Sequence, residues 1–131
     1  MLLDTSGLLC LHHRHETHHH DAYHLFRTSA RRILHNYVIA EFVALARARR
    51  LPRVPSLRFA AELLDNPWVE FRWVDEALHR AALKFVQARP DKRYSLCDAV
   101  SFLVMRQSGV HEALTTDRHF EREGFVRMLK A

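Results

Sequence analysis

Segments of strand length alternate with helical segments along this chain, and no other feature restricts its fold as strongly. Strand character marks residues 1–4, 68–74, 112–116 and 125–129. Helical patterns occupy residues 5–12, 19–32, 36–50, 57–64, 75–88 and 95–107, and Asp117 opens a last helical turn. Such alternation is typical of α/β proteins in which helices cover a parallel sheet. We therefore predict an α/β sandwich with a mostly parallel central sheet.

The length and composition indicate one folded domain of the cytoplasm. The 131 residues suffice for a single domain, residues 1–131, and are too few for two ordinary ones. No apolar run approaches the ~18 residues of a membrane-spanning helix. Asp4 interrupts the apolar start, which lacks the basic segment of a secretory signal. Cys10 and Cys97 have no CxxC partner, so we expect reduced thiols.

The chain is basic, with a formal net charge of +5. A positively charged protein attracts polyanions, either nucleic acid or an acidic protein partner. Many basic proteins bind neither, so the charge alone does not choose between these alternatives.

Two aspartates follow predicted strands. Asp4 comes directly after "MLL", and Asp117 comes directly after "EALTT". In open α/β sheets, ligand sites form outside the carboxyl ends of the strands. Each aspartate could instead cap the helix that follows it. For each residue taken alone, both interpretations stand.

Glu41 lies inside the apolar stretch "NYVIAEFVAL". At helical spacing its neighbours are Tyr37, Val38, Ala44 and Leu45, all apolar or aromatic. Burial of an unpaired carboxylate is costly. Glu41 is therefore a functional acid on an apolar face, a surface residue of a helix with a different phase, or the partner of a buried arginine.

Asp98 lies near the start of a strongly apolar helix. It follows Ser95 by three positions, a spacing that resembles a capping box with aspartate in place of glutamate. Asp98 could therefore serve only the start of the helix, where an acid meets the helix dipole. Residues 99–105 are apolar almost all round, however, which indicates a buried helix that would carry Asp98 into the interior.

A parallel sheet can bring all four acids, Asp4, Glu41, Asp98 and Asp117, to one edge. Carboxylates gathered there repel one another by roughly 4 kcal/mol per close pair at an effective dielectric constant of about 20. A hard divalent cation would offset this repulsion, which favours Mg²⁺, with Mn²⁺ as a substitute. Acid clusters that hold such ions activate water and stabilise in-line attack on phosphodiesters.

Four segments of the chain resemble the successive motifs of PIN domains. They are "MLLDTSGLL", "NYVIAEFVAL", "YSLCDAVSF" and "ALTTDRHFEREGF", and together they span essentially the whole chain. More specifically, they resemble the VapC toxins of bacterial VapBC toxin–antitoxin pairs. The resemblance implies a PIN-like three-layer α/β/α sandwich with a mostly parallel sheet. It also implies a type II toxin that is a Mg²⁺-dependent endoribonuclease, which hydrolyses phosphodiester bonds of tRNA, rRNA or mRNA.

The resemblance further implies roles for individual residues. Asp4 and Asp98 would be the central Mg²⁺ ligands, and Asp117 would assist directly or through water. Glu41 would complete the site and position or deprotonate the attacking water. Two hydroxyl-bearing residues match positions that support such sites: Ser6 and Thr115.

The expected partners follow from the same resemblance: an RNA substrate, an acidic VapB-like antitoxin and a second copy of the chain in a homodimer. Two residues depart from the family pattern. His119 stands where many relatives carry a further acid, so the resemblance supports no fifth carboxylate. Gly7 stands where a larger apolar residue is common, which weakens the first helix.

The stretch "HHRHETHHHD" contains six histidines between residues 12 and 20. It could bind Zn²⁺ or Ni²⁺, but a polar, solvent-facing loop is the simpler interpretation. In PIN toxins this loop flanks the catalytic groove, so His19 is a candidate contact for RNA phosphate. Arg118 directly follows the last acid and is a second candidate. Trp68 and Trp73 are expected to pack in the core.

Two other functions compete with the toxin. A PIN nuclease of RNA maturation or decay would act without an antitoxin. A non-catalytic basic adaptor would bind nucleic acid and use the acids only as helix caps.

Overall fold

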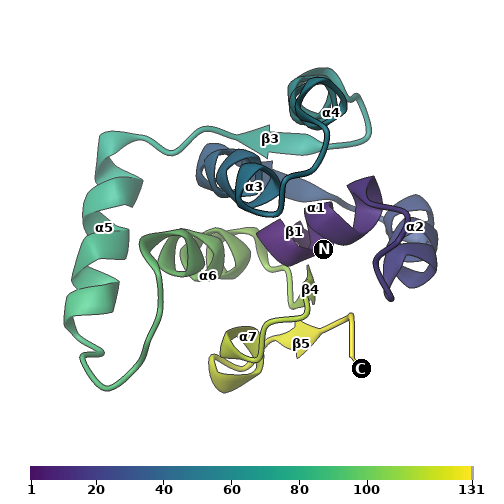
Figure 1. Cartoon of the computed structure of the whole chain (residues 1–131). Coiled ribbons are helices and arrows are strands. Elements are labelled where there is room, and N and C mark those ends of the chain that lie inside the picture. Colours follow the sequence, from purple (N-terminus) through teal and green to yellow (C-terminus); the bar gives the residue numbers. More distant parts are fainter. Residues whose placement is uncertain (131) are drawn as a thin grey trace.

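The computed structural model describes residues 1–130 and contains a five-stranded sheet with the order β3-β2-β1-β4-β5 (Figure 1). The strands are β1 (Leu2–Leu3), β2 (Ile33–His35), β3 (Glu70–Arg72), β4 (Glu112–Leu114) and β5 (Val126–Arg127). The helices are α1 (Thr5–His12), α2 (His19–Thr28), α3 (Asn36–Ala48), α4 (Arg53–Asp65), α5 (Glu76–Gln87), α6 (Leu96–Ser108) and α7 (His119–Arg122). Each strand pairing is parallel. The predicted parallel α/β fold is therefore confirmed.

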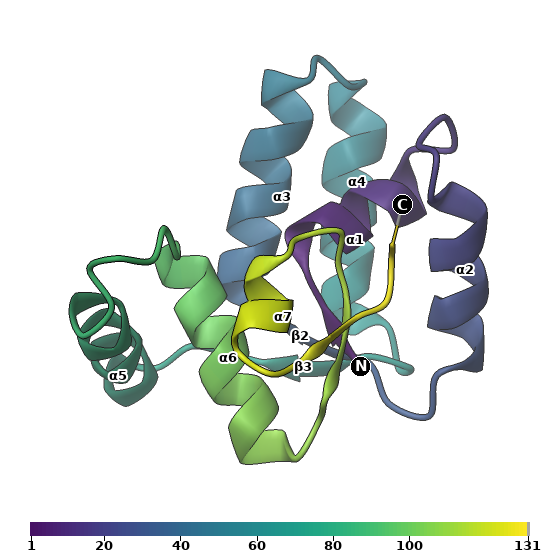
Figure 2. The same ribbon diagram turned by 90° about the horizontal axis from the view of Figure 1, so that it is seen from below.

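Apolar side chains form one core on each face of the sheet, because successive residues of a strand point to opposite faces. Leu2 belongs to the core that includes α5, α6 and α7, whereas Leu3 belongs to the core that includes α1, α2, α3 and α4. Ile33 and Leu34 of β2 divide in the same way. The sheet is thus the middle layer of an α/β/α sandwich, with α3 beside α4 and α5 beside α6 (Figures 1 and 2).

The order of the strands reverses next to β1. The chain places β2 on one side of β1 and β4 on the other, and β1 pairs in parallel with both. The carboxyl ends of β1 and β4 therefore lie side by side at a topological switch point, which is where open α/β sheets place their sites. Asp4 and Asp117 follow these two strands in the sequence.

The structure differs from the predicted elements at two places. The strand β2 was not predicted, and α2 ends at Thr28 instead of extending to residue 32. All three residues of β2 are buried, so the strand lacks the alternation of apolar and polar residues that would reveal it in the sequence. Helix α4 begins at Arg53, four residues earlier than predicted. Pro55 falls in its first turn, where the missing N–H removes no helical hydrogen bond.

Helix α3, which carries Glu41, begins at a buried histidine. His35 is the N-cap residue, and its Nδ1 accepts the backbone N–H of Val38 at 3.4 Å. Its Nε2 lies 2.8 Å from the Ser101 hydroxyl. Burial, aided by the charge of Arg72, lowers the pKa of His35 to about 3, so the ring is neutral at physiological pH. A neutral ring fits its role as a hydrogen-bond acceptor at the start of α3.

Both tryptophans lie on the surface, so their predicted place in the core is wrong. Trp68 is 58% exposed and Trp73 is 65% exposed. They flank β3, the edge strand of the sheet, which has a neighbour on one side only. Trp68 is covered by the Arg32 guanidinium, 5.5 Å from its ring centroid, and Trp73 packs against Phe71.

Gly7 allows α1 to lie directly against β4. A Cβ atom at this position would be only 2.0 Å from the carbonyl oxygen of Leu114. The departure from the family pattern at Gly7 therefore has a packing reason, because only a residue without a side chain permits this approach. Across residues 1–130, no helix is both long and apolar enough to cross a membrane.

Candidate active site

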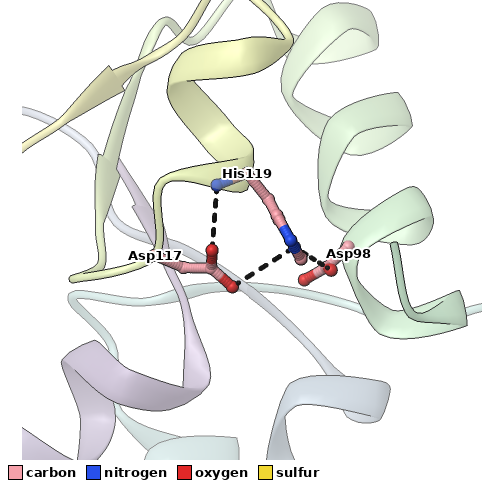
Figure 3. Close-up of side chains that lie close together, drawn as sticks. All are labelled: Asp98, Asp117 and His119. Carbon is pink, nitrogen blue, oxygen red and sulfur yellow. Dashed lines mark hydrogen bonds and ion pairs between the residues drawn. The ribbon is translucent and has the colours of Figure 1, made fainter. Parts of the chain in front are cut away.

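Three of the four predicted site acids lie on separate elements at the carboxyl edge of the sheet. Asp4 is the N-cap residue of α1, directly after β1. Asp98 lies in the first turn of α6, and Asp117 lies in the loop between β4 and α7. Figure 3 shows Asp98 and Asp117 on either side of the His119 side chain. Residues that are far apart in sequence thus meet at the switch point.

The Thr115 hydroxyl connects Asp4 to the Asp117 loop. It donates to Oδ2 of Asp4 at 2.7 Å and accepts the backbone N–H of Asp117 at 3.0 Å. The Ser6 hydroxyl lies 3.1 Å from Thr115 Oγ1 and accepts the backbone N–H of Thr116 at 3.0 Å. The two residues predicted to support the site therefore contact each other and fix the relative positions of α1 and the loop.

Asp4 carries a buried carboxyl group that pairs with no lysine or arginine among residues 1–130. Burial raises its pKa from 3.8 to about 7; the Thr115 hydrogen bond opposes this rise, and the negative charges of Asp98 and Glu41 add to it. Near neutral pH this carboxyl therefore exists in both protonation states. A cation bound beside it would favour the charged form.

Asp98 caps its helix and faces the site at the same time. The predicted capping box is present: the Ser95 hydroxyl accepts the Asp98 N–H, and Oδ2 of Asp98 accepts the Ser95 N–H, both at 3.0 Å. The same Oδ2 lies 3.0 Å from Nδ1 of His119. Within the described structure, Oδ1 of Asp98 has no hydrogen-bond partner. Capping thus fixes the Asp98 carboxylate in orientation while it still faces the site.

His119 joins the two aspartates, and the sequence did not predict it as a site residue. Its backbone N–H donates to Oδ1 of Asp117 at 2.8 Å, and its Nδ1 lies 3.5 Å from Oδ2 of Asp117. Among residues 1–130, only Asp98, Asp117 and His119 place three or more potential metal-ligand atoms within 4.8 Å of one another. The only sequence feature that could have indicated a role for His119 is its position, two residues after Asp117.

Glu41 borders this cluster from α3 and is exposed to solvent. The buried side of α3 consists of Val38, Phe42 and Ala46, and Ala44 is exposed. The buried face is therefore displaced by one residue from the predicted phase, and Glu41 matches the alternative of a surface residue on a helix with a different phase. Glu41 is nevertheless close to the other acids, since its charge raises the pKa of Asp4.

The Cys97 thiol is a buried neighbour that three of the acids share. Burial raises its pKa most, and the charges of Glu41, Asp4 and Asp98 raise it further. The thiol is 7% exposed and stays protonated. These three carboxylates therefore all lie near one buried thiol, which indicates that Glu41 is on the Asp4–Asp98 side of the site.

The two predicted substrate contacts differ in their surroundings. Arg118 is exposed next to Asp117, and its guanidinium forms no hydrogen bond or ion pair within residues 1–130. His19 lies at the start of α2, where its Nδ1 pairs with the Cys10 carbonyl oxygen at 2.7 Å. No described contact joins His19 to the acids. The histidine-rich stretch contributes no group of metal ligands among the described residues.

The fold and the site together place the protein among α/β/α domains that carry an acidic site at the carboxyl edge of a parallel sheet. The sequence model of the PIN domain matches residues 1–126, so the chain belongs to the PIN domain family. Its structure is similar to the crystal structure of VapC20 from Mycobacterium tuberculosis, a sarcin–ricin loop cleaving toxin, with a TM-score of 0.85 and 28% identity over 95% of each chain. No curated protein sequence matches the chain.

Proposed function

We propose that this protein is a VapC-type toxin, a divalent-metal-dependent endoribonuclease of a toxin–antitoxin pair. The observation that carries the proposal is the convergence of Asp4, Asp98 and Asp117 at the switch point of a PIN domain. The similarity to VapC20 over 95% of both chains supports the assignment to a toxin. The basic net charge of +5 fits an RNA substrate and an acidic antitoxin.

The residues present fit a divalent cation. Asp98 and Asp117 offer carboxylate oxygens within 4.8 Å of each other, and Asp4 adds a buried carboxyl whose pKa is raised. Oxygen donors of this kind suit Mg²⁺ and Mn²⁺. When bound, such an ion supplies charge stabilisation and a water of lowered pKa. We therefore propose Asp4, Asp98 and Asp117 as its protein ligands.

The protein's own side chains would perform the remaining tasks. Glu41, exposed at the border of the cluster, can orient the attacking water and accept its proton. Thr115 and Ser6 hold Asp4 and the Asp117 loop in place. Arg118 can contact a substrate phosphate, because it directly follows Asp117 and its exposed guanidinium has no partner among the described residues. We further propose that residues 1–131 form one domain. We also propose that two copies of the chain form a homodimer, the usual assembly of the toxins that it resembles.

Asp98→Asn tests this function in cells. The amide keeps the shape and the capping interactions of Asp98 but loses the charge that would hold the cation, so we expect loss of growth arrest on induced expression. Asp91→Asn is the matched control, because Asp91 is an exposed acid outside the site. Its expression should arrest growth like the unchanged protein, and circular dichroism should show that both variants are folded.

The growth assay, combined with a cleavage assay on RNA, separates the competing functions. Coexpression of the adjacent gene should relieve the arrest if the protein is a toxin with an antitoxin. A nuclease of RNA maturation or decay would show metal-dependent cleavage without this relief. A non-catalytic adaptor would keep its effect in Asp98→Asn, and that result would remove the catalytic assignment.

A further inference from the structure

His119 is the one basic side chain that the described structure places against the site acids. Among residues 1–130, no lysine or arginine forms an ion pair with Asp4, Glu41, Asp98 or Asp117. His119 Nδ1 faces oxygens of two of them, Oδ2 of Asp98 at 3.0 Å and Oδ2 of Asp117 at 3.5 Å (Figure 3). The His119 Nδ1 atom therefore lies between the carboxylates of Asp98 and Asp117, at the sequence position where many relatives carry a further acid.

These separations suit ligands of one ion. Two donor atoms that are both about 2.1 Å from a cation and at right angles to each other are about 3.0 Å apart. The distance of 3.0 Å from Nδ1 to Asp98 matches this value, and the 3.5 Å to Asp117 lies close to it. A small rotation of the half-buried Asp117 side chain would complete the arrangement.

The packing around His119 keeps its ring in this orientation. Tyr94 packs edge-on against the ring, with centroids 5.2 Å apart. The Tyr94 hydroxyl donates to Glu123 at 2.7 Å, and Glu123 is paired with Arg106 at 3.0 Å. The ring is thus held in place by packing against a tyrosine that is itself hydrogen-bonded outside the site.

We propose that His119 is a direct nitrogen ligand of the divalent cation and that it shifts the preference of the site from Mg²⁺ towards transition-metal ions such as Mn²⁺. The inference rests on the proposed metal-dependent function. Mg²⁺ favours sites made only of oxygen donors, whereas imidazole suits first-row transition metals. A site with an imidazole in place of a further carboxylate therefore loses Mg²⁺ affinity more than Mn²⁺ affinity.

The direct test is the electron spin-echo spectrum of Mn²⁺ bound to the protein. The unchanged protein should show the ¹⁴N coupling of a bound imidazole, and His119→Gln should lose it. His111→Gln is the matched control, because His111 is exposed and precedes β4, at the opposite end of that strand from the site. Asp98→Asn provides the background from Mn²⁺ bound elsewhere, including the histidine-rich stretch.

A second variant keeps the test decisive if His119→Gln does not fold. His119→Asp restores an all-oxygen site, so the Mn²⁺-over-Mg²⁺ preference, measured by titration calorimetry, should fall on the order of tenfold. Mn²⁺ bound without ¹⁴N coupling, together with an unchanged preference, would make His119 only an ion-pair partner and overturn the inference while the proposed function stands. If the unchanged protein binds neither ion above the Asp98→Asn background, the proposed function itself fails.

Discussion

Replacing Asp4 with asparagine is expected to abolish RNA cleavage and to raise the melting temperature of the metal-free protein. The loss of cleavage follows from the removal of a central charge from the proposed metal site, and we expect it to be on the order of 10³-fold. The gain in stability follows from burial, because the amide that replaces the carboxyl group carries no charge that the interior disfavours. The amide oxygen can still accept the Thr115 hydroxyl that now donates to Asp4.

The stability gain should depend on pH in a defined direction. The folded pKa of Asp4 is about 7, against an ordinary value of 3.8. Below pH ~4 the carboxyl is neutral in both states, so the substitution changes little. As the pH rises towards 7, the unfolded chain loses the proton first, and the folded state is penalised by on the order of 4 kcal/mol at most. Above the folded pKa the penalty is constant.

Thermal unfolding between pH 4 and pH 8 measures this dependence. Asp4→Asn should melt at a higher temperature than the unchanged protein at pH 8, and the two should converge near pH 4. Added Mg²⁺ or Mn²⁺ should stabilise the unchanged protein and leave Asp4→Asn unaffected. Asp91→Asn, which changes an exposed acid outside the site, should melt like the unchanged protein at each pH and should be stabilised by added metal to the same extent. An equal gain at all pH values would contradict the raised pKa of Asp4.

Gly7→Ala should disrupt both stability and activity. The new methyl group would meet the Leu114 carbonyl oxygen at 2.0 Å, and backbone atoms cannot move aside as a side chain can. Helix α1 must therefore move away from β4, at a cost of about 1–3 kcal/mol. Because the start of α1 carries Asp4 and Ser6, the movement should also separate them from Thr115 and reduce cleavage.

Gly109→Ala separates a general loss of stability from a specific loss of activity. Gly109 has a φ of 67° and open space around its Cβ position, so alanine there should cost about 1–2 kcal/mol through backbone strain alone. Chemical denaturation should show both variants destabilised, but Gly109→Ala should cleave RNA at an unchanged rate per folded molecule. Full activity of Gly7→Ala would show that α1 does not need its close approach to β4.

Much of the site could be predicted from local patterns. Asp4 and Asp117 were visible because each follows a short apolar strand, and parallel strands end at the same edge of a sheet. Asp98 was visible because its helix is apolar almost all round. Its role as a cap and its place at the site were posed as alternatives, yet the structure shows the cap and the site position in one residue.

The remaining features depend on three-dimensional context that no local pattern contains. The phase of α3 misled the prediction for Glu41, because the edge of the sandwich exposes residues that a fully covered helix would bury. Trp68 and Trp73 alternate with polar residues as core residues do, but they flank an edge strand. His119 reaches the site because α7 packs near the first turn of α6, a contact that no local sequence pattern indicates.

Cleavage of RNA by the purified protein tests the central claim most directly. Total RNA would be incubated with the antitoxin-free protein in MgCl₂, MnCl₂ or EDTA, and the new RNA ends would be mapped by sequencing. We predict a small set of discrete ends that require a divalent ion and that are absent with folded Asp98→Asn. RNA left intact in both metal ions, or identical ends produced in EDTA or by Asp98→Asn, would contradict the assignment of a metal-dependent endoribonuclease.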